Sequence, residues 1–86
     1  MNVVYLADIE GKKNLAQAID LIGGPNADYD KAEQVLRSCV NIRNGELQRV
    51  CGALLQFLII AQAGIAPDIV AQGLNRCRSM LAAVEL

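Results

Sequence analysis

A long uncharged segment runs from Val50 to Pro67 in the second half of this 86-residue chain. A helix that crosses a bilayer needs about 20 apolar residues in succession. Here the 14 residues from 50 to 63 precede Gly64, where a helix is expected to end, and Gln56 and Gln62 interrupt them. The segment is therefore too short to span a membrane, and we expect a helix that is buried inside a folded domain.

The helical repeat shows that this segment has more than one apolar face. Over residues 46–63, six residues form an ordinary core face: Leu47, Val50, Cys51, Leu54, Leu55 and Leu58. Ile59 widens that face, and the side that should be polar carries a second apolar stripe made of Ala53, Phe57 and Ile60. A helix that is apolar nearly all round is typically a buried helix, so we expect neighbours on several sides of it.

The rest of the chain predicts three further helices. The length suits one domain, residues 1–86, and the apolar side chains are mostly aliphatic, since 53% of the residues are hydrophobic but only 3% are aromatic. Threonine is absent, which also favours helix over strand. The predicted fold is all-α, a small bundle of four helices over about residues 12–22, 29–43, 46–63 and 67–85, with the third helix central.

The ends of the second helix rest on local signals. Its start is predicted at Asp28 or at Asp30, and Asp30 with Glu33 forms an aspartate version of the capping box. Its end is predicted near Arg43, because Asn44–Gly45 is typical of a turn or a helix cap. The alternative is one continuous helix through Gly45, at a cost of about 1 kcal/mol relative to alanine.

The two ends of the chain differ in how much they predict. Pro67 fits the first turn of a fourth helix, which carries an apolar series at 4-3-4-3 spacing: Val70, Leu74, Cys77, Leu81 and Val84. Residues 2–9 stay open between a strand, a helical turn and an extended lead-in, because their strand-favouring side chains have no visible partner strand.

The composition gives little support for catalysis. Histidine, the commonest general base near neutral pH, is absent, and the two serines, Ser38 and Ser79, have no base nearby in the sequence. Cys39, Cys51 and Cys77 are widely spaced among apolar residues, where a free thiol behaves as a small hydrophobic group. We therefore expect no enzyme, no catalytic residue, no cofactor and no metal ligand.

The charge balance limits the classes of partner. Eight basic and nine acidic residues give a net charge of −1, whereas a nucleic-acid or membrane-surface binder is expected to cluster lysine and arginine. The amino-terminal residues carry an acid where a signal peptide carries bases. We therefore expect a cytoplasmic protein with no membrane contact, and nucleic acid is an unlikely partner.

Gly64 and Val70 are spaced six residues apart in the segment from Ala61 to Asn75. This spacing resembles the helix-turn-helix of repressor-type regulators, in which a glycine turn follows an alanine-bearing helix and a valine lies six residues after the glycine. The resemblance covers about 15 residues and implies an alternative function, a dimeric DNA-binding regulator that uses residues 61–78.

The basic residues that this alternative would use are Arg76 and Arg78. Pro67 and Asp68, which open the presumed recognition helix, depart from the pattern, because an acid directed at DNA phosphates is repulsive. The DNA-binding hypothesis is therefore the weaker of the two that we carry forward.

The second apolar stripe of the third helix suggests the stronger hypothesis. Burial of a large side chain contributes about 1.5–3 kcal/mol, so Phe57, Ile59 and Ile60 left in water would forgo roughly 5–9 kcal/mol, about the whole stability of a small domain. A second copy or a different protein would cover the stripe. The alternative is a monomer in which the first helix and residues 2–9 cover it.

We therefore expect a non-catalytic protein–protein interaction module, such as an adaptor, a small chaperone, an inhibitor or a regulatory subunit, and a homodimer, with no small-molecule substrate implied. Its apolar helical surface would receive a helix in a groove. The residues expected to make this contact are Ala53, Leu54, Phe57, Leu58 and Ile60, with Arg49, Gln56 and Gln62 at the rim.

Overall fold

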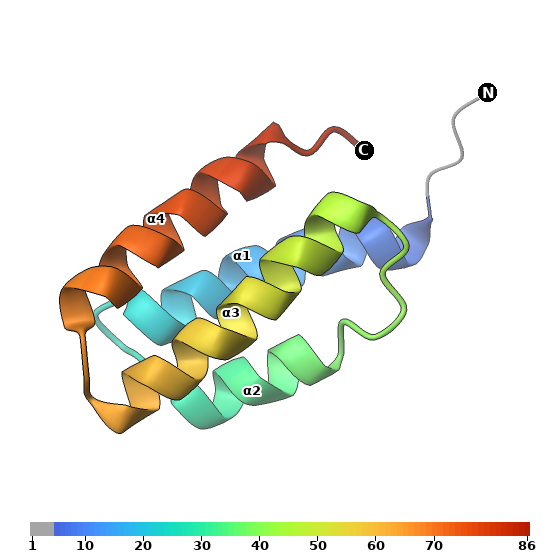
Figure 1. Cartoon of the computed structure of the whole chain (residues 1–86). Helices are drawn as coiled ribbons and strands as arrows, with labels where there is room; N and C mark the ends of the chain where they lie inside the picture. The colour runs from blue at the N-terminus through green and yellow to red at the C-terminus, as the bar shows by residue number, and fades with distance from the viewer. Residues whose placement is uncertain (1–4) are drawn as a thin grey trace.

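A computed structural model describes residues 5–86 as four helices joined by short loops (Figure 1). The helices are α1 (Leu6–Gly23), α2 (Tyr29–Arg37), α3 (Gly45–Ala63) and α4 (Pro67–Ala83). No strand occurs within these residues. The predicted fold class, a small all-α bundle of four helices, is confirmed.

The bundle is organised around α1 and α3. Each of these two helices contacts all three others, whereas α2 and α4 make no contact with each other anywhere in the described chain. Figure 1 shows α2 and α4 on opposite sides of the α1–α3 pair. The central position predicted for the third helix is therefore confirmed, and α1 shares it.

The core is built from the apolar stripes that the helical repeat predicts. The buried residues of α1 include Leu15, Ala18, Ile19 and Ile22, and those of α3 are Leu47, Val50, Leu54 and Leu58. The 4-3-4-3 series of the fourth helix is buried at every position, Val70, Leu74, Cys77, Leu81 and Val84, although Val84 lies just after the last helical residue. Ordinary packing inside the domain therefore accounts for that series.

The first helix begins six residues earlier than predicted, at Leu6 instead of residue 12. Of residues 2–9, which the sequence left open, residues 6–9 are helical and Tyr5 just before them is extended (φ −88°, ψ 136°). Residues 2–4 lie outside the described chain. The buried side chain of Asp8, only 5% exposed, explains why the helix begins this early. Its carboxylate accepts hydrogen bonds from the backbone N–H groups of Arg43 (2.7 Å) and Asn44 (3.1 Å), so this first turn of α1 holds the loop that leads into α3.

The second helix ends at Arg37, six residues before the predicted end at residue 43. The chain must turn there so that Ile42 can pack on α1 against Gly11, where an added Cβ would lie 2.6 Å from the Ile42 side chain. The predicted helix over 29–43 is therefore wrong beyond Arg37, because Cys39 and Val40 lie in the turn. Cys39 is still buried in the core, whereas Val40 is 79% exposed. A continuous helix through residue 45 is also excluded.

Side-chain caps explain the starts of α2 and α3. Asp28, and not Asp30, caps α2 by accepting a hydrogen bond from the backbone N–H of Lys31 at 3.1 Å. Asn44 caps α3, since its side chain accepts from the backbone N–H of Leu47 at 3.1 Å. Asn44–Gly45 therefore marks the beginning of the third helix and not the end of the second.

The turn between α3 and α4 is short and has an unusual backbone. Gly64 ends α3 in the left-handed conformation (φ 70°), as predicted, and Pro67 is the first residue of α4. Ala66 is also in the left-handed conformation (φ 48°), which residues other than glycine rarely adopt. This tight turn returns α4 along α3 in the opposite direction (Figure 1).

Candidate interaction surface and pocket

One side of α3 faces solvent, because the other helices pack on its remaining sides. We call this side the outer face of α3 and define it by six exposed, uncharged residues: Gly52, Leu55, Gln56, Ile59, Gln62 and Ala63. Ile59 is 66% exposed and Leu55 is 39% exposed. Gly52, Leu55, Ile59 and Gln62 follow a 3-4-3 spacing, so they lie along one line of the helix, as the contact residues of paired helices do.

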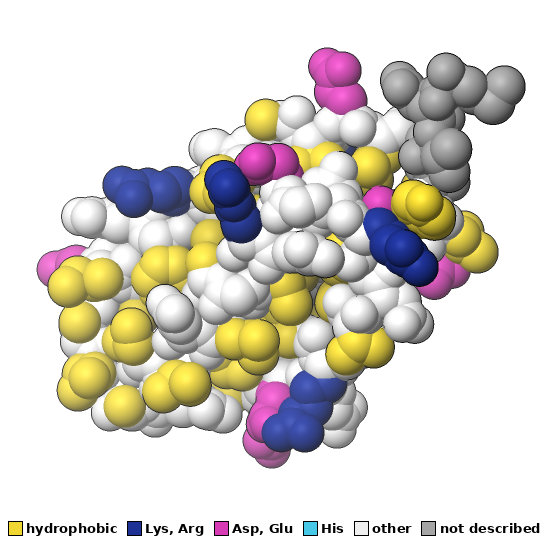
Figure 2. Space-filling view, turned by 45° about the vertical axis from the view of Figure 1, so that its right-hand side comes forward, with side chains coloured by type: hydrophobic (Ala, Val, Ile, Leu, Met, Phe, Trp, Pro, Cys, Tyr) yellow, Lys and Arg dark blue, Asp and Glu magenta, His cyan; other side chains and the backbone are white. Residues whose placement is uncertain are grey.

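The apolar surface continues around the end of the bundle. Ile65 in the α3–α4 turn is 60% exposed, and Ile69 in the first turn of α4 is 59% exposed. Figure 2 shows hydrophobic side chains gathered at this end of the molecule, with few charged groups among them. Isolated apolar side chains on a surface are ordinary, but an uncharged cluster of this kind is typical of contact with another molecule.

The residues that we predicted to make the contact differ in how far they are buried. Leu54 and Leu58 are buried in the core, at 0% and 3% exposure, so a partner cannot reach them without unfolding the bundle. Ala53, Phe57 and Ile60 are half-buried and pack against the core. The expected surface is therefore corrected at Leu54 and Leu58, because α1 and the flanking helices already cover that side of α3.

The stripe Ala53–Phe57–Ile60 is covered in part by α4. Phe57 packs directly over Gly73, where an added Cβ would overlap three atoms of its ring. The sequence contained this signal, since a glycine inside a helix costs about 1 kcal/mol relative to alanine unless a close neighbour requires it. The side left open is the one that carries Leu55 and Ile59. The sequence prediction is wrong there, because it placed Leu55 in the core face and took Ile59 to widen that face.

The predicted rim residues are all on the surface. Arg49, Gln56 and Gln62 are exposed, and Arg49 lies 3.7 Å from the carboxylate of Glu46 in an exposed ion pair. Gln56 and Gln62 belong to the outer face of α3. Arg49 is the last charged residue before the uncharged segment that begins at Val50.

The geometry of α3 and α4 differs from that of a helix-turn-helix, whose two helices cross at a large angle. Phe57 and Gly73 are each about 10 Å along their helices from the turn, and perpendicular helices would be well separated there. They are instead in contact, because α3 and α4 run side by side. The structure thus gives the DNA-binding alternative no support from helix geometry.

The two arginines of that alternative also point apart. Arg76 and Arg78 are two residues apart on α4, which places them about 200° apart around the helix, so both cannot face one phosphate backbone. Arg78 bonds to Asp20 of α1 at 3.0 Å and to Asn75 at 3.3 Å. These contacts join α4 to α1.

The described residues contain no cluster of three acidic, cysteine or histidine side chains that could hold a metal ion. Cys39, Cys51 and Cys77 are free, and burial raises the pKa of each thiol above the ordinary value of 9.0. A thiol that stays protonated at neutral pH is a poor nucleophile and a poor ligand. In residues 5–86 no helix has the length and hydropathy needed to cross a bilayer.

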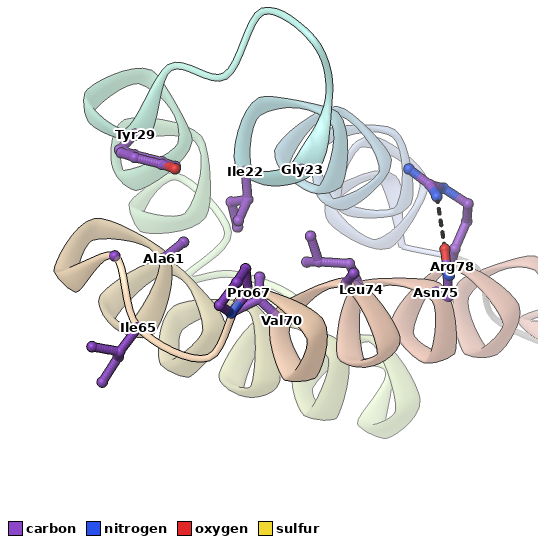
Figure 3. A pocket seen from close by; sticks show the side chains of 12 residues that line it. Ile22, Gly23, Tyr29, Ala61, Ile65, Pro67, Val70, Leu74, Asn75 and Arg78 are labelled. Atoms are coloured by element: carbon purple, nitrogen blue, oxygen red, sulfur yellow. Dashed lines mark hydrogen bonds between the residues drawn. The ribbon is translucent and has the colours of Figure 1, made fainter.

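A pocket of about 380 Å³ opens on the side where α2 and α4 fail to meet (Figure 3). Its walls come from the carboxyl-terminal end of α1, the start of α2, the end of α3 and most of α4. The lining residues are Ile22, Gly23, Tyr29, Ala61, Gly64, Ile65, Pro67, Val70, Ala71, Leu74, Asn75 and Arg78. The sequence did not predict this pocket. Its existence depends on the separation between α2 and α4, and these two helices make no contact with each other.

Comparison of the chain with models of protein families, with curated proteins and with solved structures finds no match. The arguments for function therefore rest on the surface and the pocket described above.

Proposed function

We propose that this chain is a non-catalytic protein–protein interaction module that pairs with a second copy of itself through the outer face of α3. The observation that carries the proposal is the exposed, uncharged line of Gly52, Leu55, Ile59 and Gln62 on a helix whose other sides are packed. A helix of a different protein is the alternative occupant of the same face. The roles that fit are those of an adaptor, a small chaperone, an inhibitor or a regulatory subunit.

Gly52 supports the approach of a second helix. It lies in the middle of α3, it is exposed, and no atom of the described residues lies within 4 Å of the place where its Cβ would be. The helix therefore carries the cost of a glycine, about 1 kcal/mol, with no packing reason inside the chain. A partner helix that crosses close to α3 at this point would supply such a reason.

The exposed apolar side chains set the expected strength of pairing. Full burial of Leu55, Ile59, Ile65 and Ile69 in both copies would contribute roughly 7–13 kcal/mol when scaled by their exposed fractions. Association costs at least about 4 kcal/mol in lost translational and rotational freedom. We therefore expect a weak, reversible dimer with a dissociation constant in the micromolar range or above.

The free thiols agree with the cytoplasm as the location. Cys39, Cys51 and Cys77 are all unpaired, and unpaired cysteines are ordinary in a reducing compartment, whereas small secreted domains tend to depend on disulfides. We keep the cytoplasmic assignment as part of the proposal.

Sedimentation velocity between about 1 µM and 1 mM tests the proposal, since this range brackets the expected dissociation constant. We expect the mass of the native protein to rise with concentration from 9.2 kDa toward twice that value. Ile59→Glu should abolish the rise without loss of stability, because the replaced side chain is largely exposed. Gln72→Glu is the matched control, an exposed position on α4 that lies outside the outer face of α3.

Two results would count against the proposal. The first is a native protein that stays monomeric at 1 mM and binds no hydrophobic dye, which would leave the outer face of α3 without any sign of a partner. The second is equal loss of association in Ile59→Glu and Gln72→Glu, because the effect would then come from added negative charge and not from the apolar line.

A further inference from the structure

The pocket between α2 and α4 is elongated along α4. That helix contributes one continuous line of lining residues, each three or four positions after another: Pro67, Val70, Ala71, Leu74, Asn75 and Arg78. At 1.5 Å per residue this line is about 16 Å long. The volume of about 380 Å³ is at the small end of the range of ligand pockets, and we call this elongated pocket the trough.

The trough is apolar at one end and polar at the other. Ala61, Ile65 and Pro67 line the end near the α3–α4 turn, and Ile22, Val70 and Leu74 line its middle. Asn75 and Arg78 lie at the opposite end, where Figure 3 shows their side chains joined by a hydrogen bond. Figure 3 also shows the hydroxyl group of Tyr29 directed toward the space from the α2 side.

The charge at the polar end is positive. Among the described residues that line the pocket, Arg78 is the one that is charged, and none is an aspartate or a glutamate. Its partner Asp20 lies outside the lining, and the two side chains are 54% and 75% exposed. An exposed ion pair of this kind contributes little, so the carboxylate of a ligand can replace that of Asp20 at the guanidinium.

We propose that this pocket binds an unbranched alkyl carboxylate of medium chain length. The hydrocarbon chain lies along α4 over the side chains of Ile22, Val70 and Leu74, which form the floor of the trough, with its far end beside Ile65. The carboxylate accepts hydrogen bonds from Arg78 at the polar end. A trough that is elongated along α4 and polar at one end fits an extended chain better than a ring system, and the single guanidinium fits a single negative charge.

Decanoate is the probe, added below its micelle concentration to the full chain and followed by NMR chemical shifts. We expect saturable shifts at Ala61, Val70 and Ala71, and an affinity that rises about fourfold for each methylene from hexanoate to decanoate. Decanol has the same chain without the carboxylate. It should bind more weakly, because it cannot form the charge-assisted hydrogen bonds.

Three variants locate the carboxylate and the chain. Arg78→Gln should weaken decanoate about tenfold and leave decanol unchanged, whereas the matched control Arg76→Gln, two residues away and outside the pocket lining, should alter neither. Asp20→Asn should strengthen decanoate about threefold, because it frees the guanidinium. Ala71→Leu should weaken both ligands, since Ala71 lines the trough at an exposed position where the larger side chain leaves the fold intact.

Several outcomes would overturn the proposal. They are the absence of saturable shifts at 1 mM decanoate, decanol binding as tightly as decanoate, and equal effects of Arg76→Gln and Arg78→Gln. Arg78 also lines a groove between α1 and α4, so the shifts decide between the two sites: shifts confined to that groove, at Ile9, Lys13 and Leu86, would place the amphiphile there and overturn the proposal. Ile65 borders both the trough and the apolar surface counted for pairing, but none of these variants changes it or lies on the outer face of α3, so their failure would leave the proposed pairing untouched.

Discussion

Two glycines of helices α3 and α4 offer a matched pair of substitutions. Gly52 has nothing within 4 Å of its missing Cβ, whereas a Cβ on Gly73 would overlap the ring of Phe57. Both glycines lie well inside helices, so replacement by alanine gains the same helix propensity, about 1 kcal/mol, in each case. The difference between the two variants therefore measures the cost of displacing the Phe57 ring.

The magnitudes predict shifts of opposite sign. Gly52→Ala should stabilise the protein by about 1 kcal/mol, which raises the melting temperature of a domain of this size by about 4–8 °C. Overpacking costs about 1–3 kcal/mol, so Gly73→Ala should lose about 1 kcal/mol net and melt lower by a similar interval. The measurement is thermal and urea unfolding followed by circular dichroism, at a protein concentration below the dissociation constant of the proposed dimer.

A double-mutant cycle assigns the effect to the ring. In a Phe57→Leu background the shorter side chain leaves space, so Gly73→Ala should there be as stabilising as Gly52→Ala. Equal stabilisation by both alanines in the native background would refute the reasoning, because the contact between Phe57 and Gly73 would then carry no energetic weight.

Three further predictions concern the loop, a cap and the buried thiols. Asp8→Ala should destabilise the protein by about 1.5–3 kcal/mol, because it removes a charged acceptor from two backbone N–H groups, and hydrogen exchange at Arg43 and Asn44 should accelerate; unchanged protection there would show that the carboxylate does not hold the loop. Asp28→Ala should cost about 1 kcal/mol in urea unfolding through loss of the α2 cap, and Asp30→Ala should cost less; the reverse order would mean that Asp30 is the cap. Burial raises the pKa of Cys77, so its contribution to stability is complete below the unfolded value near 9.0 and falls as the pH rises past it; the urea midpoint of the native protein should drop more between pH 7 and pH 10 than that of Cys77→Ala, and equal drops would argue against this linkage.

Much of the fold follows from patterns that are local in the sequence. The apolar repeats of α1, α3 and α4 predict the buried faces, and the glycine and proline signals predict the α3–α4 turn. These signals act within one helix or one turn, so they do not depend on the rest of the structure. The same is true of the exposed ion pair between Glu33 and Arg37, which lie four residues apart on α2 at 2.7 Å.

The early end of α2 could not be predicted from local signals. The stripe through Cys39 and Val40 continues the helical pattern, but Asp8 binds the backbone at Arg43 and Asn44, and Ile42 needs space on α1. The two hydrogen bonds join residues that are 35 and 36 positions apart in the sequence. Tertiary packing therefore overrides local propensity in this segment.

The position of the candidate surface was predicted only in part. The sequence identified α3 as a helix with too many apolar sides, but it did not show which sides its neighbours occupy. Because α4 packs its Gly73 against Phe57, the stripe that we expected to be open is partly covered, and Leu55 and Ile59 are left exposed instead. Helix-to-helix placement decides this point, and no single helix encodes it.

The central claim is that two copies meet at the outer face of α3. A soluble paramagnetic agent, added across a dilution series of the native protein, reports directly on the exposure of each methyl group. In dilute protein, Ile59 and Ile9 should both be accessible, at their 66% and 40% exposed fractions. At millimolar concentration Ile59 should become protected, while Ile9 on α1 should stay accessible. If Ile59 remains equally accessible at every concentration, or if Ile9 is protected in its place, the outer face of α3 is not where the copies meet.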